Sequence, residues 1–120
     1  MKKIEMYIRP EKLETVKEIL NDEEIYGMTV TMVSGCGRQK GRKEFYRGTE
    51  VNLNLLPKVK IETVVCDDVV DTLIDKVTKA IRTGEVGDGK VFVFDVIDAI
   101  KIRTGETGDA AITDKVVQLA

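Results

Sequence analysis

Residues 35–58, GCGRQKGRKEFYRGTEVNLNLLPK, lie between two stretches in which apolar and polar residues alternate, and this arrangement organises the whole chain. Alternation over residues 28–32 and again over residues 59–65 is the pattern of half-buried β-strands. Between them, from about residue 41 to residue 56, no helical or strand period is visible. A loop of this length in a small domain is functional, disordered or a sign of a wrong assignment, and the regular elements on either side argue against the last of these. We therefore interpret residues 35–58 as the enlarged tip of a β-hairpin, a mobile binding loop on a rigid base.

The residues before this hairpin predict a strand followed by a helix. Apolar residues alternate over residues 4–8, and Pro10 suits the first position of a helix because its missing N–H costs nothing there. An apolar helical face follows, and the helix is expected to end around residues 21–24. This face consists of Leu13, Val16, Ile19 and Leu20.

A second helix is predicted directly after the hairpin. Asp67 and Asp68 are expected to cap it, with Asp71 in the capping-box position, and Gly84 is expected to end it. Its buried stripe is expected to consist of Val70, Leu73, Ile74, Val77 and Ile81.

Two more extended pieces complete the pattern, an apolar strand over residues 91–96 and a shorter piece over residues 100–103. The order β-α-β-β-α-β predicts an α+β, ferredoxin-like fold with an antiparallel sheet and two helices on one face. Apolar residues on both faces of the last strand, such as Phe92 opposite Val93, indicate that the second sheet face is also buried. A homo-oligomer would cover it, and an unseen partner domain is the alternative.

Composition excludes several classes of function. The chain has 120 residues, enough for one domain, and its net charge of −2 gives no general affinity for nucleic acid or anionic lipid. It contains no histidine, the commonest general base and metal ligand. Cys36 and Cys66 are isolated, so we expect neither a zinc site nor a disulfide framework, and a reducing, cytoplasmic compartment. We expect no signal peptide and no transmembrane segment.

Two glycine-rich segments offer backbone N–H groups to an anionic ligand. One is residues 35–41, and the other is residues 84–90, GEVGDGK, which end in a lysine. Taken singly, the first is equally a glycine-rich strand end and the second is better explained as a helix-to-strand turn, and only the presence of both favours an anionic ligand. The second is no P-loop, because Val91 stands where Ser or Thr is required and the segment follows a helix. Lys101 and Arg103 fall on one face of the expected extended piece, where they either contact phosphates or are solvated. No nucleophile–base arrangement is visible, which argues against a dedicated hydrolase or transferase.

Several longer motifs occur in order along the chain. They are KKIEMYIRPEKL (2–13), GMTVTMVSGCGRQKG (27–41), YRG (46–48), LPKVKIE (56–62), TGEVGDGKVFVFDV (83–96) and IRTGE (102–106). On these motifs the chain resembles the PII nitrogen-regulatory signalling proteins, the GlnB/GlnK family, over residues 1 to about 112.

The resemblance implies a trimer of ferredoxin-like subunits that is not an enzyme. Residues 1–112 would form the signalling domain, with the family's T-loop at about 37–55 and a C-terminal tail at 113–120. In this family ATP or ADP binds in each cleft between subunits, and 2-oxoglutarate joins Mg-ATP at the base of the T-loop. The T-loop then controls a target protein. The expected target here is an ammonium transporter, and the alternative is regulation of glutamine synthetase or of nitrogenase. The alternatives are a different small-molecule effector and a slow, incidental ATPase.

The resemblance also implies roles for individual residues. Nucleotide contacts would come from Tyr7, Gly27, Met28, Thr29, Gly35, Cys36, Gly37, Arg38, Gln39, Glu62, Val64, Gly87, Asp88, Gly89, Lys90, Lys101 and Arg103. Thr29 of a neighbouring subunit, with Glu62 and Val64, would surround the adenosine, and the neighbour's Lys101 and Arg103 would contact phosphates. Contacts to 2-oxoglutarate would come from Gly37, Arg38, Gln39, Lys40, Gly41 and Lys58. Gln39 would also ligate Mg²⁺. The target would contact Arg42, Lys43, Tyr46, Arg47, Thr49 and Val51.

Three positions depart from or sharpen the family pattern. Many bacterial members are uridylylated or adenylylated on a tyrosine where this chain has Val51, so signalling is expected to depend on ligands alone. Lys101 replaces the frequent arginine and keeps the charge without the bidentate fork. Arg47 matches the arginine that members insert into the pore of ammonium transporters.

Overall fold

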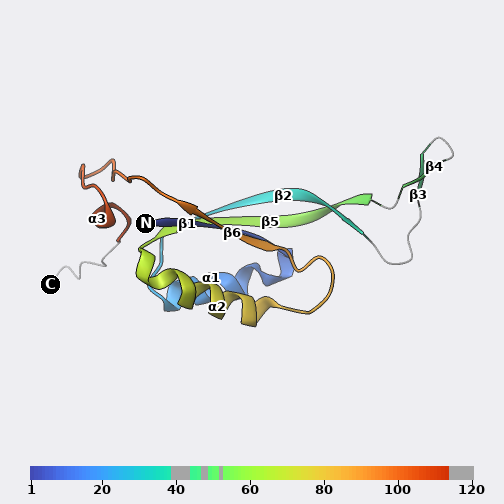
Figure 1. The fold of residues 1–120 in the computed structure, drawn as a ribbon, viewed down its shortest axis with the longest axis horizontal. Coiled ribbons are helices and arrows are strands. Elements are labelled where there is room, and N and C mark those ends of the chain that lie inside the picture. Colours follow the sequence, from blue (N-terminus) through green and yellow to red (C-terminus); the bar gives the residue numbers. More distant parts are fainter. Residues whose placement is uncertain (39–43, 47–48, 52, 114–120) are drawn as a thin grey trace.

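The computed structural model of the protein describes residues 1–38, 44–46, 49–51 and 53–113. Its sheet has the strand order β2-β5-β1-β6 with every neighbouring pair antiparallel, and helices α1 and α2 lie together on one face (Figure 1). The elements are β1 (Lys2–Ile8), η1 (Pro10–Lys12), α1 (Leu13–Asp22), β2 (Met28–Arg38), β3 (Glu44–Tyr46), β4 (Thr49–Val51), β5 (Leu53–Val65), η2 (Asp67–Val69), α2 (Val70–Ile81), β6 (Lys90–Asp95) and α3 (Asp109–Ile112). This is the predicted ferredoxin-like arrangement, with α3 as an addition that the sequence pattern did not predict.

The core lies between the helices and the facing side of β1 and β5. Because side chains alternate across a strand, the apolar residues of these two strands share one face and meet the apolar stripes of α1 and α2. The buried apolar residues are Ile4, Met6, Ile8, Val16, Leu20, Val59, Ile61, Val65, Val70, Leu73, Val77 and Ile81. The predicted buried faces of β1, β5 and both helices are therefore confirmed, with Leu13, Ile19 and Ile74 partly buried against them. The half-buried face predicted for residues 28–32 is wrong for the single chain, because Val30 and Met32 on the edge strand β2 are 39% and 72% exposed.

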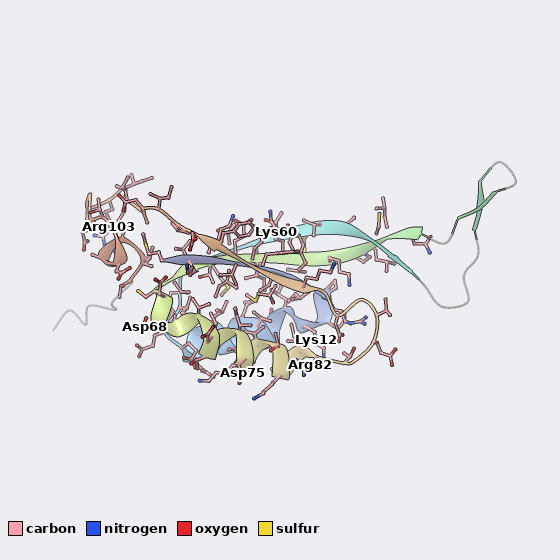
Figure 2. All side chains as sticks on the ribbon, in the orientation of Figure 1. Lys12, Lys60, Asp68, Asp75, Arg82 and Arg103 are labelled. Atoms are coloured by element: carbon pink, nitrogen blue, oxygen red, sulfur yellow. The ribbon has the colours of Figure 1, made fainter. Side chains whose placement is uncertain are left out.

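The other sheet face carries charged and aromatic side chains and is open in the single chain. Phe92 and Phe94 are each 45% exposed there, and Lys60 points away from the two helices (Figure 2). Lys3 lies over the Phe94 ring, 4.7 Å from its centroid. Large apolar side chains left half-exposed on a sheet face indicate a surface that another layer covers.

Strands β2 and β5 continue beyond the helices as a long two-stranded arm. Their register is unbroken from Met28 opposite Thr63 to Arg38 opposite Leu53, and the β3–β4 hairpin lies past the end of the arm (Figure 1). The prediction of an irregular loop over residues 41–56 is thus wrong for the described part of that range. A strand shows alternation when one of its faces is buried, and the arm lies beyond the helices that bury the sheet.

The predicted cap of the second helix is also wrong. The helix begins with the 3₁₀ turn η2, which places Asp67 and Asp68 inside its first turn, and no side chain caps η2 or α2. Asp67 instead pairs with the N-terminal ammonium group of Met1 at 2.9 Å. Gly84 does not end the helix, because α2 stops at Ile81 and the next residue is already extended.

Residues 100–103 form part of a turn and not the predicted extended piece. The Gly105 N–H donates to the Lys101 carbonyl at 2.7 Å, and the neighbouring bridge joins only Ile100 and Thr107. Arg103 lies at the α3 end of the molecule (Figure 2). Lys101 and Arg103 therefore do not share the face of a strand.

No helix in the described part of the chain is long and apolar enough to cross a membrane.

Candidate functional site

A cavity of about 750 Å³ opens where the β2–β5 arm leaves the body of the protein, and we call it the arm-base cavity. It is bounded by the end of β1, the glycine run of β2 and the loop between α2 and β6. The structure brings nine predicted ligand-binding residues together around it. They are Tyr7, Gly35, Cys36, Gly37, Lys58, Gly87, Asp88, Gly89 and Lys90.

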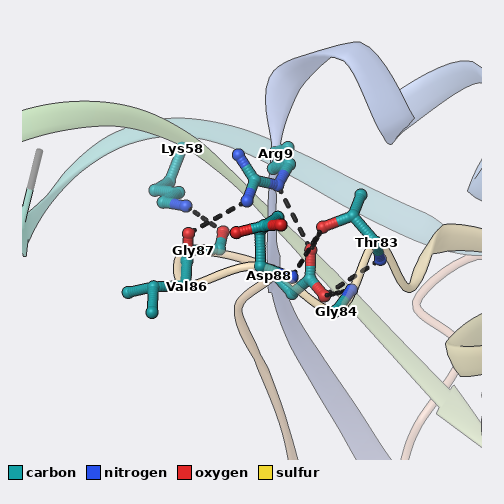
Figure 3. A network of polar contacts seen from close by, with 8 residues as sticks. Arg9, Lys58, Thr83, Gly84, Val86, Gly87 and Asp88 are labelled. Atoms are coloured by element: carbon teal, nitrogen blue, oxygen red, sulfur yellow. Dashed lines mark hydrogen bonds and ion pairs between the residues drawn. The ribbon is translucent and has the colours of Figure 1, made fainter. Parts of the chain in front are cut away.

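One carboxylate organises the α2–β6 loop at this cavity (Figure 3). Asp88 accepts hydrogen bonds from the Thr83 and Gly84 N–H groups at 3.0 and 2.9 Å and from the Thr83 hydroxyl at 2.5 Å. The Arg9 guanidinium donates to the same carboxylate at 3.3 Å. The Thr83 hydroxyl, followed by these N–H groups and Arg9, holds the pKa of Asp88 far below its ordinary value. A loop fixed in this way presents its backbone to the cavity in one conformation.

Three basic side chains surround the loop. Arg9 donates to the Val86 carbonyl at 3.0 Å, and the Lys58 ammonium group donates to the Gly87 carbonyl (Figure 3). Lys58 and Lys90 form no ion pair with any carboxylate in the described ranges. Two lysines without acidic partners beside glycine backbone make a site suited to an anion.

Arg9 was not predicted as a site residue. In the sequence, a single arginine after a strand cannot be distinguished from an arginine exposed to solvent. Only the fold brings Arg9 against the α2–β6 loop. No spacing in the sequence connects Arg9 with Asp88, which is 79 residues further along the chain.

We expect Asp88→Asn to lower the melting temperature at about pH 7, with the difference from the parent protein shrinking below about pH 4. A carboxyl group whose pKa is lowered by folding stabilises the fold above its unfolded pKa of about 3.9, and this contribution is lost as the pH falls toward the folded pKa. Calorimetric unfolding at about pH 7 and about pH 3, at one protein concentration, measures the effect.

Asp75→Asn is the matched control for this prediction. Asp75 pairs with Lys79 at 2.9 Å on the exposed side of α2, and such pairs contribute about 0.3–0.5 kcal/mol. Equal losses for the two variants, or a difference independent of pH, would contradict the role assigned to Asp88.

Tyr7 forms an aromatic wall of the arm-base cavity. Its ring packs edge-on against Phe92, with centroids 6.0 Å apart and planes at 81°, and its hydroxyl donates to Glu5 at 2.5 Å. This hydrogen bond lowers the pKa of Glu5 and raises that of Tyr7. Both groups therefore keep the charge states in which the hydroxyl donates and the carboxylate accepts.

A second cavity of about 540 Å³ lies at the other end of the sheet, and we call it the α3 cavity. It is lined by four further predicted nucleotide residues, together with Cys66 and the last residues of α3. These four are Gly27, Thr29, Glu62 and Val64. The Glu62 carboxylate pairs with Lys60 at 2.8 Å.

One chain therefore does not assemble the predicted nucleotide site. Lys58 at the arm-base cavity and Glu62 at the α3 cavity are four residues apart on β5, about 13 Å at about 3.3 Å per residue. Met28, Lys101 and Arg103 line neither cavity. The predicted residues form two groups on one subunit, separated along the strand.

For four of the remaining predicted site residues the structure describes the backbone only, and the others lie outside the described part of the chain. Arg38 ends β2, Tyr46 ends β3, and Thr49 and Val51 bound β4. The residues outside the described ranges are Gln39, Lys40, Gly41, Arg42, Lys43 and Arg47.

Comparison with known proteins agrees with the motifs and with the fold. A family model described as "Nitrogen regulatory protein P-II" matches residues 1–106. The Nitrogen regulatory protein P-II of Klebsiella oxytoca and the Nitrogen regulatory protein P-II 1 of Escherichia coli K12 are each 58% identical over 112 residues, covering 93% of this chain and 100% of the relative. A solved structure described as "Structure of B. subtilis GlnK" superposes with a TM-score of 0.76 at 38% identity, covering 92% of this chain and 96% of that one. The chain belongs to the P-II family of nitrogen regulatory proteins.

Proposed function

We propose that this protein senses ATP, ADP and 2-oxoglutarate in clefts between the subunits of a homotrimer and controls a target protein through its T-loop. The observation that carries the proposal is the division of the nucleotide residues between two cavities at separate places along β5. If the arm-base cavity of one subunit faces the α3 cavity of the next, the two halves complete one site. Repeating this heterologous contact around a three-fold axis closes the ring.

The arm-base half suits the phosphates. The loop around Gly87 is fixed by Asp88, and Lys90 carries a positive charge that no described carboxylate neutralises. Backbone N–H groups and a lysine together bind phosphate groups well. The α3 half, with the apolar Val64 beside Glu62, then receives the adenosine.

Lys58 is the residue that we assign to 2-oxoglutarate. Its ammonium group now donates to the Gly87 carbonyl, and a ligand carboxylate would give it a stronger, charge-assisted partner. Gln39 would join Mg²⁺ to ATP and to the effector. Since these ligands contact one another, their binding is mutually supportive and reciprocal.

We assign the output to the T-loop. The β3–β4 hairpin lies past the end of the arm and away from the helices (Figure 1), where a target can reach it without contacting the cavities. An ammonium transporter is the target that we propose first, because Arg47 matches the family residue that enters its pore. The role is regulatory and does not require catalysis.

Calorimetric titration tests this function. We expect Mg-ATP to bind the parent protein, and 2-oxoglutarate to bind only when Mg-ATP is present. Lys58→Met should weaken 2-oxoglutarate about tenfold to a hundredfold, the effect of about 1.5–3 kcal/mol for a hydrogen bond to a charged group. The same variant should leave Mg-ATP affinity nearly unchanged. Equal binding of 2-oxoglutarate with and without nucleotide would overturn the mechanism.

A further inference from the structure

We propose that Glu5 is a positioning residue for the nucleotide site, which through the Tyr7 hydroxyl fixes the aromatic wall of the arm-base cavity against which the base of the nucleotide packs. This rests on the proposed function, because it assigns a further residue to that same site. Glu5 itself lines neither the arm-base cavity nor the α3 cavity. It therefore acts on a bound nucleotide through Tyr7 and not by contact.

The Tyr7 ring is tied to the open face of the sheet through its hydroxyl. Glu5 and Tyr7 are two residues apart on β1, so both side chains lie on the face opposite the helices. The Tyr7 hydroxyl donates to the Glu5 carboxylate at 2.5 Å, and the Glu5 side chain is only 13% exposed. The ring cannot change its rotamer without breaking this hydrogen bond. A side chain outside the cavity thus sets the orientation of one that lines it.

Phe92 holds the same ring from the neighbouring strand. The Tyr7 and Phe92 rings pack edge-on, with centroids 6.0 Å apart and planes at 81°, and both residues line the arm-base cavity. In the register of β1 and β6, Phe92 lies opposite Glu5, whereas Lys90 lies opposite Tyr7. Both contacts of Tyr7 therefore draw its ring along the sheet toward Glu5 and away from Lys90.

This placement suits the base of the nucleotide. The phosphates are assigned to Lys90 and to the backbone around Gly87, so the rest of the nucleotide extends beyond them. Tyr7 and Phe92 give the arm-base cavity its aromatic surface, and a base packs favourably on an aromatic ring. The α3 cavity of the next subunit would cover the other side of the base with Val64.

The Glu5 carboxylate is held in place before any ligand binds. The Lys3 ammonium group pairs with it at 3.3 Å and also lies over the Phe94 ring. The Tyr7 hydroxyl, followed by Lys3, lowers the pKa of Glu5, so the carboxylate remains charged. A hydrogen bond to a charged acceptor is about twice as strong as one between neutral groups. Glu5 therefore restrains the Tyr7 ring more firmly than a neutral acceptor would.

The core of the fold does not depend on this pair. The core residues of β1 are Ile4, Met6 and Ile8, and they face the helices on the other side of the sheet. Loss of the Glu5 carboxylate therefore leaves the packing of the core intact. A change in nucleotide affinity then reports on the cavity wall.

Calorimetric titration of ATP into variants at position 5 tests the role of Glu5. Glu5→Ala should lower the affinity about threefold to tenfold, part of the contribution of one base stacked on an aromatic ring. Glu5→Gln keeps an acceptor oxygen for the Tyr7 hydroxyl and should restore most of this loss. Asp95→Ala is the matched control and should leave the affinity unchanged, because the Lys2–Asp95 pair lies on the same sheet but Asp95 lines neither cavity. Sedimentation should give one mass for all variants.

A double-mutant cycle and a second probe separate positioning from a general structural effect. Tyr7→Phe keeps the ring and loses the hydroxyl, so it should weaken ATP binding as much as Glu5→Ala does. The double variant should lose no more than either single variant, whereas independent effects would multiply. Inorganic tripolyphosphate, which has no base, should bind the variants as it binds the parent protein.

Three results would each overturn the proposal alone. They are unchanged ATP affinity in Glu5→Ala, losses that multiply in the double variant, and losses for tripolyphosphate equal to those for ATP. A parent protein that binds no ATP would instead overturn the proposed function, and this proposal with it.

Discussion

Gly89→Ala is expected to destabilise the fold by at least about 4 kcal/mol, a loss that few single substitutions reach. Gly89 has φ +98°, in the region that only glycine adopts freely, and a Cβ added there would overlap the Tyr7 carbonyl oxygen and lie 2.8 Å from its carbon. Both contacts are with backbone atoms of Tyr7, so a change of side-chain rotamer cannot relieve the overlap. Relief requires moving β6 away from β1, and β1 is one of the two inner strands that carry the core.

Gly84→Ala is the matched control for this prediction. Gly84 lies in the same loop at φ +85°, but a Cβ there meets nothing within 4 Å. Gly84→Ala should therefore lower the free energy of unfolding only by the cost of holding alanine in the left-handed conformation, about 1–2 kcal/mol. Urea unfolding of both variants at one protein concentration measures the difference. Similar losses for the two variants would show that the close approach at Tyr7 relaxes easily.

The buried faces of this fold were predictable from the sequence because burial imposes a period. Alternate residues of β1 and β5 are buried, and so are the residues of α2 at helical spacing. Where β5 leaves the helices its faces lose their cover and the period disappears, whereas the edge strand β2 alternates over residues 28–32 although Val30 and Met32 are exposed in the single chain. The backbone ladder nevertheless continues to Arg38 opposite Leu53, since main-chain pairing does not depend on side-chain polarity.

The helix ends were not predictable, because contacts distant in sequence decide them. Asp67 resembles a cap, yet the ammonium group of Met1 takes its carboxylate. Gly84 resembles a helix stop, but Asp88 binds the N–H groups of Thr83 and Gly84, and the helix has already ended at Ile81. Short-range patterns do not contain these partners.

The candidate site was predictable as a set of residues but not as an arrangement. The resemblance implied a site between subunits and supplied residues at both cavities, such as Lys90 and Glu62, but it did not show how one chain divides them between two separate cavities. That separation follows from the register of β5, which assigns residues near Lys58 to the arm and residues near Glu62 to the opposite end. Spacing in the sequence does not reveal it.

Mixing two variants, each defective in one half-site, should restore nucleotide binding that neither variant shows alone. Lys90→Glu reverses the charge at the arm-base cavity, and Thr29→Trp fills the α3 cavity from the exposed edge strand β2. Each variant alone should lose ATP affinity by at least about tenfold to a hundredfold, since a hydrogen bond to a charged group contributes about 1.5–3 kcal/mol.

The amount restored follows from the geometry of the cleft. In an equal mixture that is unfolded and refolded together, half of the subunits supply an intact arm-base cavity and half supply an intact α3 cavity. If every site joins the two cavities of different subunits, about one quarter of the sites receive two intact halves. The fraction of intact sites is measured as bound ATP per subunit, at an ATP concentration that saturates intact sites but not defective ones. Each variant refolded by itself is the control. A site contained in one subunit would give no recovery, because every subunit in the mixture carries one broken half.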